Sequence, residues 1–153
     1  QYNMKGEVPT SPDFVLPIGK ADIKRVGKDV TVVTYGRMLE RVLQAADKAL
    51  EKGIEVEVVD LMTLAPLDRE TIINSVKKTG RVLLVNDAHK TGGFLGEIAA
   101  SIVESGAFDY LDSRILRLAA EDIPTPYNHS LEVAMLPDVN RILKYIERLY
   151  DKR

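Results

Sequence analysis

The chain contains no cysteine and no long apolar run. Without cysteine it cannot form a disulfide, use a thiolate nucleophile or hold a metal through sulfur, and this composition fits a reducing compartment. No stretch approaches the roughly 18 consecutive apolar residues of a membrane span, and the first residues lack the apolar centre of a signal peptide. We therefore expect a soluble, cytoplasmic protein without a membrane partner.

A surplus of basic charge is also missing. The 21 Lys and Arg residues are balanced by 23 Asp and Glu residues, which gives a net charge of −2, and both signs are spread along the chain. Domains that bind nucleic acid usually present a basic stripe or patch. The sequence therefore predicts no nucleic-acid partner.

The remaining composition suits one globular domain. With 153 residues, of which 45% are hydrophobic, the chain can bury one sizeable core, and domains typically span roughly 100–200 residues. The first residues are polar, contain proline and show no regular pattern. We expect residues 1–13 to be a tether from a preceding domain of a longer polypeptide, and residues 14–153 to form the domain.

Short segments rich in Val, Ile and Leu alternate with segments of helical periodicity. The predicted strands, which have the composition of strands covered on both faces, are residues 29–35, 54–60, 81–86 and 114–119. The predicted helices are residues 39–50, 69–78, 94–104 and 138–150. Asp68 is a suitable N-cap for the second helix, and Gly53 and Gly80 can supply left-handed ends for the first two.

This alternation predicts a three-layer α/β/α sandwich, in which right-handed βαβ units build a mostly parallel sheet. Residues 18–25 alternate weakly and are joined to the first strong strand by Val26, Gly27 and Lys28. We interpret them as an antiparallel edge strand that forms a hairpin with that neighbour. The predicted sheet then has five strands.

The most informative stretch, residues 86–97, carries a polar cluster and a Gly-Gly pair from the end of a predicted strand into a helix. The first strong strand also ends in polar residues. Because the carboxyl ends of parallel strands meet at one edge of a sheet, ligands and partners usually contact the protein there. We predict a ligand-binding or interface site formed by Tyr35, Gly36, Arg37, Asn86, Asp87, His89, Gly92 and Gly93.

Several of these residues have a structural alternative to a functional role. His89 can act as a general base or hold an anion, but a loop histidine is often only solvated. The Gly92-Gly93 pair can cradle a phosphate at a helix N-terminus or simply permit a tight turn. Arg37 can bind a carboxylate or a phosphate, or it can pair with Glu40 one helical turn away.

Familiar motifs of doubly wound sheets are missing from the sequence. A single glycine, Gly36, follows the first strong strand where a dinucleotide site needs three, and Lys90-Thr91 precedes Gly92-Gly93 where a P-loop needs the reverse order. A nucleophile elbow, G-x-S-x-G, is also absent. The residues therefore contain no complete catalytic set.

Five segments carry a resemblance to a known family, at residues 16–27, 29–37, 59–68, 91–98 and 121–132. In this order and spacing, which extend over nearly the whole chain, they resemble the C-terminal domain of the β subunit of thiamine diphosphate-dependent 2-oxoacid dehydrogenases. This family includes the pyruvate, branched-chain and acetoin types and belongs to the wider transketolase C-terminal domain group. The resemblance implies a three-layer α/β/α domain with a five-stranded, mostly parallel sheet and one antiparallel edge strand.

The resemblance also implies a division of labour in the parent enzyme. Such enzymes oxidatively decarboxylate a 2-oxoacid on thiamine diphosphate and transfer the acyl group to a lipoyl arm. Thiamine diphosphate and Mg are bound by other domains, so the resemblance implies no catalytic, cofactor-binding or metal-binding residue in this chain, which should be inactive alone. The implied partners are the α subunit, a second β subunit and the subunit-binding domain of the acyltransferase.

Two alternatives stay open at this point. The chain can be a stand-alone module that binds a small anion or has a regulatory role through its strand-end loops, or it can be the C-terminal section of a transketolase-like enzyme. Some members of the family carry His-Glu-Ala-Pro where residues 86–89 of this chain are Asn-Asp-Ala-His. No role for this loop is therefore transferred, and the sequence does not indicate which 2-oxoacid is used.

Overall fold

A computed structural model describes residues 7–151 and contains a single five-stranded sheet between helices. The strands are β1 (Asp22–Arg25), β2 (Val30–Thr34), β3 (Val56–Asp60), β4 (Val82–His89) and β5 (Leu116–Ala120). The helices are α1 (Met38–Leu50), α2 (Arg69–Thr79), α3 (Leu95–Val103), α4 (His129–Met135) and α5 (Val139–Tyr150), with a short 3₁₀ helix η1 (Phe108–Tyr110).

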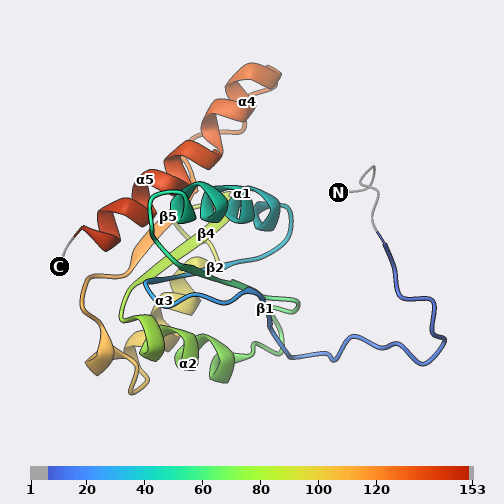
Figure 1. The fold of residues 1–153 in the computed structure, drawn as a ribbon. Coiled ribbons are helices and arrows are strands. Elements are labelled where there is room, and N and C mark those ends of the chain that lie inside the picture. The colour runs from blue at the N-terminus through green and yellow to red at the C-terminus, as the bar shows by residue number, and fades with distance from the viewer. Residues whose placement is uncertain (1–6, 152–153) are drawn as a thin grey trace.

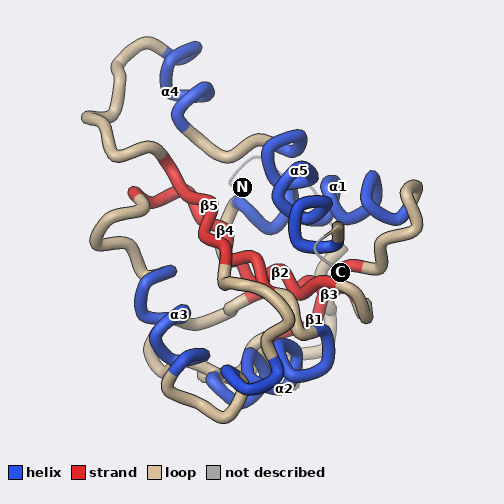
Figure 2. The backbone as a smooth tube through the Cα atoms, turned by 90° about the vertical axis from the view of Figure 1, so that its left-hand side faces the viewer, coloured by secondary structure: helices blue, strands red, loops and turns tan. Residues whose placement is uncertain are grey.

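The strand order is β1-β3-β2-β4-β5, and only the β1–β3 pair is antiparallel. Helices α1 and α5 cover one face of the sheet, whereas α2 and α3 cover the other (Figures 1 and 2). This arrangement is the predicted three-layer α/β/α sandwich with a five-stranded, mostly parallel sheet and one antiparallel edge strand, so the predicted fold class is confirmed.

The core consists of two apolar layers because successive side chains of a strand point to opposite faces. In β2, Val30 and Val32 pack beneath α1 and α5, while Val33 packs beneath α2 and α3. All three are fully buried, which explains why the strands read as continuous apolar runs. Complete burial of a side chain such as Ile146 of α5 contributes about 1.5–3 kcal/mol to folding.

The ends of α2 follow the sequence prediction. The carboxylate of Asp68 accepts hydrogen bonds from the backbone N–H and the hydroxyl of Thr71, at 3.2 and 2.8 Å. It also accepts one from the backbone N–H of Ala21, at 3.0 Å, which ties the segment before β1 to this helix. At the other end Gly80 adopts a φ of +66°, the left-handed conformation that glycine tolerates best.

The predicted hairpin of residues 18–25 with the first strong strand is wrong. β1 is an antiparallel edge strand, but it pairs with β3. β2 has β3 and β4 on its two sides, so it has no free edge for β1. The connection crosses β3 closely: a Cβ on Gly27 would lie 2.3 Å from the backbone nitrogen of Glu57.

The predicted boundary between the fourth strand and its loop is also wrong. β4 does not end at residue 86 but continues to His89, which pairs with Ala120 of β5 beyond an irregularity in register. The polar composition of residues 86–89 suggested a loop, whereas pairing with β5 keeps this segment extended. Its first residue, Asn86, is fully buried.

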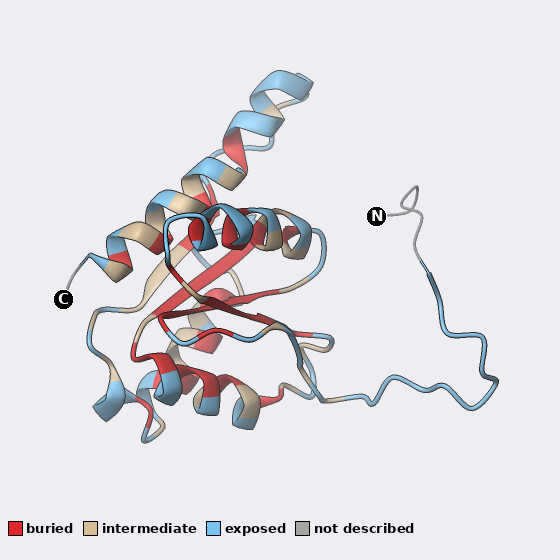
Figure 3. Cartoon of the chain, viewed as in Figure 1, coloured by how far each residue is buried: buried red, intermediate tan, exposed pale blue. Residues whose placement is uncertain are grey.

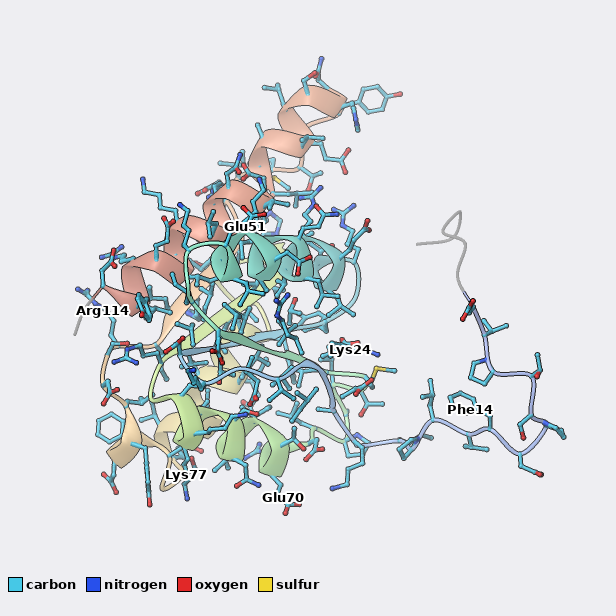
Figure 4. All side chains as sticks on the ribbon, in the orientation of Figure 1. Phe14, Lys24, Glu51, Glu70, Lys77 and Arg114 are labelled. Carbon is cyan, nitrogen blue, oxygen red and sulfur yellow. The ribbon has the colours of Figure 1, made fainter. Side chains whose placement is uncertain are left out.

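The segment before β1 lies away from the domain in Figures 1 and 3, and Figure 4 shows Phe14 on this extended stretch. Residues 7–17 are all exposed, including Val15 at 79%. Residues 1–6 of the predicted tether lie outside the described part of the chain. Among residues 7–151, none of the helices combines the length and apolarity that a membrane crossing requires.

Candidate functional site

The candidate site lies where β2 and β4 run side by side and reach the carboxyl edge of the sheet. Thr34 pairs with Val85, so the residues that follow them, Tyr35 and Asn86, are neighbours. Asn86 donates a 2.7 Å hydrogen bond from its Nδ2 to the hydroxyl oxygen of Tyr35. The Tyr35 ring meets the ring of Phe94 edge-on, with centroids 6.5 Å apart. These contacts hold the centre of the site in one arrangement.

Asn86 also presents an oxygen that accepts no hydrogen bond from any other described residue. Its side-chain Oδ1 is buried and has no hydrogen-bond partner within residues 7–151. A buried polar atom without a partner costs about 1–3 kcal/mol. The position beside Tyr35 therefore has one acceptor that a donor from outside this part of the chain can satisfy.

Arg37 and Asp87 form an ion pair across the two strand ends. The Nε of Arg37 donates to Oδ2 of Asp87 at 2.7 Å, and both side chains are partly exposed. The alternative pair of Arg37 with Glu40 is not formed in the structure. Because Asp87 already neutralises the guanidinium, the capacity of Arg37 to hold an anion is reduced. Gly36 precedes this pair with a φ of +63°.

The Gly92-Gly93 pair makes a tight turn between β4 and α3. Gly92 has a φ of +72°, and a Cβ on Gly93 would lie only 2.2 Å from the carbonyl oxygen of His89. Each glycine thus has its own reason to lack a side chain. α3 begins two residues after the pair, and its N-terminus has no side-chain cap.

His89 and Thr91 contact the segment that follows β5. His89 Nε2 lies 2.9 Å from the carbonyl oxygen of Ile123. The carboxylate of Asp122 accepts a 2.6 Å bond from the Thr91 hydroxyl and a 3.0 Å bond from the Thr91 backbone N–H. The hydrogen bond from the Thr91 hydroxyl is the main cause that lowers the pKa of Asp122 below its ordinary value. This part of the site therefore anchors another segment.

The structure divides the predicted site residues into two groups. Tyr35, Gly36, Arg37, Asn86 and Asp87 gather at the ends of β2 and β4, whereas His89, Gly92 and Gly93 shape the turn that meets Asp122. Neither group pairs a nucleophile with a base. Across residues 7–151, no cluster of three or more His, Asp or Glu side chains is placed to hold a metal ion.

Sequence reasoning missed three contributors to this edge: Phe94, Thr91 and Asp122. Asp122 follows the last predicted strand by only a few residues. A carboxylate at that position could have indicated that Asp122 belongs to the same sheet edge. His129 is the first residue of α4 and does not cap that helix. The cap of α4 is Asn128, whose side chain accepts from two backbone N–H groups.

The architecture and this sheet edge agree with a known family. A family model described as "Transketolase, C-terminal domain" matches residues 19–142. The chain belongs to the transketolase C-terminal domain family. The match extends from just before β1 into α5, so it includes all five strands and the whole candidate site of this transketolase C-terminal domain.

Curated relatives of this transketolase C-terminal domain are β subunits of dehydrogenases. The 2-oxoisovalerate dehydrogenase subunit beta of Bacillus subtilis (strain 168) is 49% identical over 140 residues, which cover 91% of this chain and 42% of the relative. The pyruvate dehydrogenase E1 component subunit beta of Rhizobium meliloti (strain 1021) is 43% identical over 146 residues, which cover 95% of this chain and 32% of the relative. The chain thus spans less than half the length of these relatives.

A solved structure has a similar fold. It is described as "Split gene transketolase, inactive beta4 tetramer", and it superposes with a TM-score of 0.73 at 25% sequence identity. The match covers 94% of this chain and 45% of that chain. The resemblance drawn from the five sequence segments is therefore confirmed at the level of the family.

Proposed function

We propose that this chain is the C-terminal section of the β subunit of a 2-oxoacid dehydrogenase. The parent enzyme oxidatively decarboxylates a 2-oxoacid on thiamine diphosphate and transfers the acyl group to a lipoyl arm. The observation that carries the proposal is the 49% identity to a 2-oxoisovalerate dehydrogenase β subunit along 91% of the chain. A cytoplasmic location accompanies this proposal, supported by the absence of cysteine.

The cofactor does not fit residues 7–151, the part of the chain that the structure describes. Thiamine diphosphate is held through its diphosphate by a divalent metal, and the described residues offer no group of three or more metal-ligating side chains. The sequence also lacks the Gly-Asp-Gly motif that the resemblance associates with that metal. We therefore derive no chemical step from this chain and place thiamine diphosphate and Mg in other domains of the parent.

The role left to this section is assembly. Its proposed partners are the α subunit, a second β subunit and the subunit-binding domain of the acyltransferase. The exposed apolar side chains of the segment before β1 and of α4 support this role, because such side chains usually mark contact surfaces when they cluster. The similar solved structure is described as a β4 tetramer, which also supports association between copies.

The alternatives receive less support from the same observations. The cation predicted for a small-anion site, Arg37, is already paired with Asp87. A transketolase-like parent is favoured only by the 25% identity to the split-gene transketolase, compared with 49% to the dehydrogenase subunit. We therefore keep the dehydrogenase as the proposed parent.

A chimaeric subunit tests the proposal. The matching 140-residue section of the Bacillus subtilis β subunit would be replaced by this chain and expressed with the α subunit of the same enzyme. Co-elution of the chimaera with the α subunit is the expected result. A matched chimaera that carries Val33→Asp in the core should fail to assemble, because it buries an unpaired charge. Failure of the unaltered chimaera to assemble, while the native subunit does, would count against the proposed function.

A further inference from the structure

Five consecutive apolar residues, Phe-Val-Leu-Pro-Ile at positions 14–18, lie in solvent before β1 and are called the strap below. Phe14 is 51% exposed, Leu16 56% and Ile18 80%. Figure 4 shows Phe14 apart from the helices and strands of the domain. Soluble proteins rarely leave such a cluster of apolar side chains uncovered. A surface that covers the strap is therefore expected.

The strap has two different sides. Successive side chains of an extended stretch point in opposite directions, so Phe14 and Leu16 share one side and Val15 and Pro17 share the other. Pro17 restricts its own backbone and disfavours the helical conformation at Leu16. The strap therefore loses less conformational entropy on binding than an unrestricted segment does.

The strap joins the domain at a fixed point. The backbone N–H of Gly19 donates to the hydroxyl of Thr63 at 3.0 Å. A Cβ on Gly19 would lie 2.8 Å from the side chain of Pro66, so the backbone packs directly against that proline. Gly19 has a φ of +79° and lies in a turn with Ile18. Because glycine adopts positive and negative φ about equally well, Gly19 can serve as a hinge for the strap.

An apolar cleft of about 520 Å³ begins beside this hinge. It lies between the connection from β3 to α2 and the start of α3. Arg69 and Glu97 at its rim form an ion pair of 2.9 Å, so they neutralise each other. The cleft therefore favours an occupant without charge, such as the strap. Its apolar lining consists of Leu64, Ala65, Pro66, Leu67 and Phe94.

We propose that the strap turns back at Gly19 and closes over this cleft, with Phe14 and Leu16 directed into it. Pro66 belongs to the cleft and also supports Gly19, so the occupant is attached at the edge of its own binding site. Five extended residues span roughly 16 Å, whereas packed helices such as α2 and α3 lie about 8–10 Å apart. The strap is thus long enough to reach the wall formed by α3. Covalent attachment also gives it a high effective concentration at the cleft.

Closure links the strap to the candidate site. Phe94 forms part of the cleft, and its ring meets the ring of Tyr35 edge-on. A closed strap therefore adds cover to the ring that supports Tyr35. Val15 and Pro17 remain on the outer side and can still contact another section of a parent enzyme. The inference goes beyond the proposed function, because it concerns contacts within one chain.

Paramagnetic relaxation measured by NMR tests closure in this chain. The sequence contains no cysteine, so Val15→Cys provides a single position for a nitroxide label on the outer side of the strap. We expect the label to broaden the backbone amide signals of Phe94 and Glu97, on the wall of the cleft formed by α3. The amide signals of Val103 and Phe108, in the other apolar cleft beside α3, should stay sharp.

Two further substitutions in the labelled chain separate closure from chance encounters. Leu16→Asp should lower the paramagnetic relaxation rate at Phe94 and Glu97 at least about fivefold, because closure would bury an unpaired carboxylate. Val8→Asp is the matched control, since Val8 is 78% exposed but lies outside the strap, and it should leave the rate unchanged. Circular dichroism melts would verify that all three chains are folded.

A mixture distinguishes closure within one chain from docking between copies. A spin-labelled chain without isotope label is mixed with an unlabelled chain that carries ¹⁵N, and no broadening at Phe94 or Glu97 is expected. Broadening in this mixture as strong as in the singly labelled chain would overturn the inference. So would sharp Phe94 and Glu97 signals in the labelled chain, or a relaxation rate that Leu16→Asp leaves unchanged. None of these results depends on assembly of the chimaera with the α subunit, so the proposed function is tested separately.

Discussion

The carboxylate of Asp122 accepts two hydrogen bonds from Thr91, one from the hydroxyl at 2.6 Å and one from the backbone N–H at 3.0 Å. The two residues are 31 positions apart in the sequence, and their contact joins the turn after β4 to the segment that follows β5. The strand-end residues at this side of the site thus position a neighbouring segment. This contact leads to the first prediction.

Thr91→Val should raise the pKa of Asp122 toward its ordinary value of 3.8, because the hydroxyl bond is the main cause that lowers it. A carboxylate whose pKa is lowered by folding stabilises the fold above its ordinary pKa, and this contribution is lost as the pH falls through the lowered value. An NMR titration of the Asp122 carboxyl carbon gives the pKa directly. Thr125→Val, in the exposed segment between β5 and α4, is the control and should leave the titration unchanged.

Asp60→Asn should stabilise the protein at neutral pH. Burial at the end of β3 is the main cause that raises the pKa of Asp60 above 3.8, so its ionised form is disfavoured by folding. As the pH falls well below 3.8, the aspartate becomes neutral in both folded and unfolded chains, and the advantage of asparagine should disappear. Thermal melts at neutral and acidic pH measure this difference. Asp13→Asn, in the exposed N-terminal segment, should have no effect; an equal gain at both pH values would contradict the account.

Gly93→Ala should lower the free energy of unfolding by about 1–3 kcal/mol, because its Cβ would lie 2.2 Å from the carbonyl oxygen of His89 and force the turn to shift. Gly106→Ala is the matched control: its Cβ would meet nothing closer than the Lys77 ammonium at 3.8 Å. Urea denaturation of both variants decides the matter. Equal free energies of unfolding for the two variants would mean that the turn after β4 can shift to accommodate a Cβ at residue 93 without cost, which would contradict the prediction.

Tyr35→Phe should destabilise the chain by about 1–3 kcal/mol, because it leaves the buried Nδ2 of Asn86 without a partner. Tyr110→Phe removes the same hydroxyl from a half-exposed ring and serves as the control. If Tyr35→Phe matched this control in urea denaturation, water would already satisfy Asn86 and the site would be more open than its burial indicates.

The chain alone should neither bind thiamine diphosphate nor decarboxylate a 2-oxoacid. The reason is the lack of a metal-ligand cluster within residues 7–151 and of a Gly-Asp-Gly motif in the sequence. Isothermal titration with thiamine diphosphate and Mg²⁺ measures the first half of this prediction. Micromolar binding would place a cofactor site in this chain.

The parts of the fold that the sequence predicted are those that depend on local pattern. β2 and β3 are buried on both faces, so their apolar composition identifies them as strands. The cap of α2 depends on Asp68 and Thr71, which are close in the chain. The partner of β1 could not be predicted from residues 18–25, because it depends on which strand of the assembled sheet has a free edge.

In the candidate site too, contacts between neighbouring strand ends could be expected from the sequence, whereas contacts between residues far apart in the chain could not. Tyr35 and Asn86 lie at neighbouring strand ends and are hydrogen-bonded, because parallel strands align their carboxyl ends. The pairing of Arg37 with Asp87 was missed because the two residues are 50 positions apart, and the sequence offered the nearer Glu40. The role of His89 was missed for a similar reason: its contact, Ile123, belongs to the segment after β5.

The most direct test of the central claim is the turnover of the chimaeric Bacillus subtilis dehydrogenase in which this chain replaces the C-terminal section of the β subunit. If this chain supplies assembly and the chemistry lies in other domains, kcat for 2-oxoisovalerate should stay within about tenfold of the native enzyme, a change of less than about 1.4 kcal/mol in the barrier. An assembled chimaera that binds its cofactor but has lost turnover would contradict the claim.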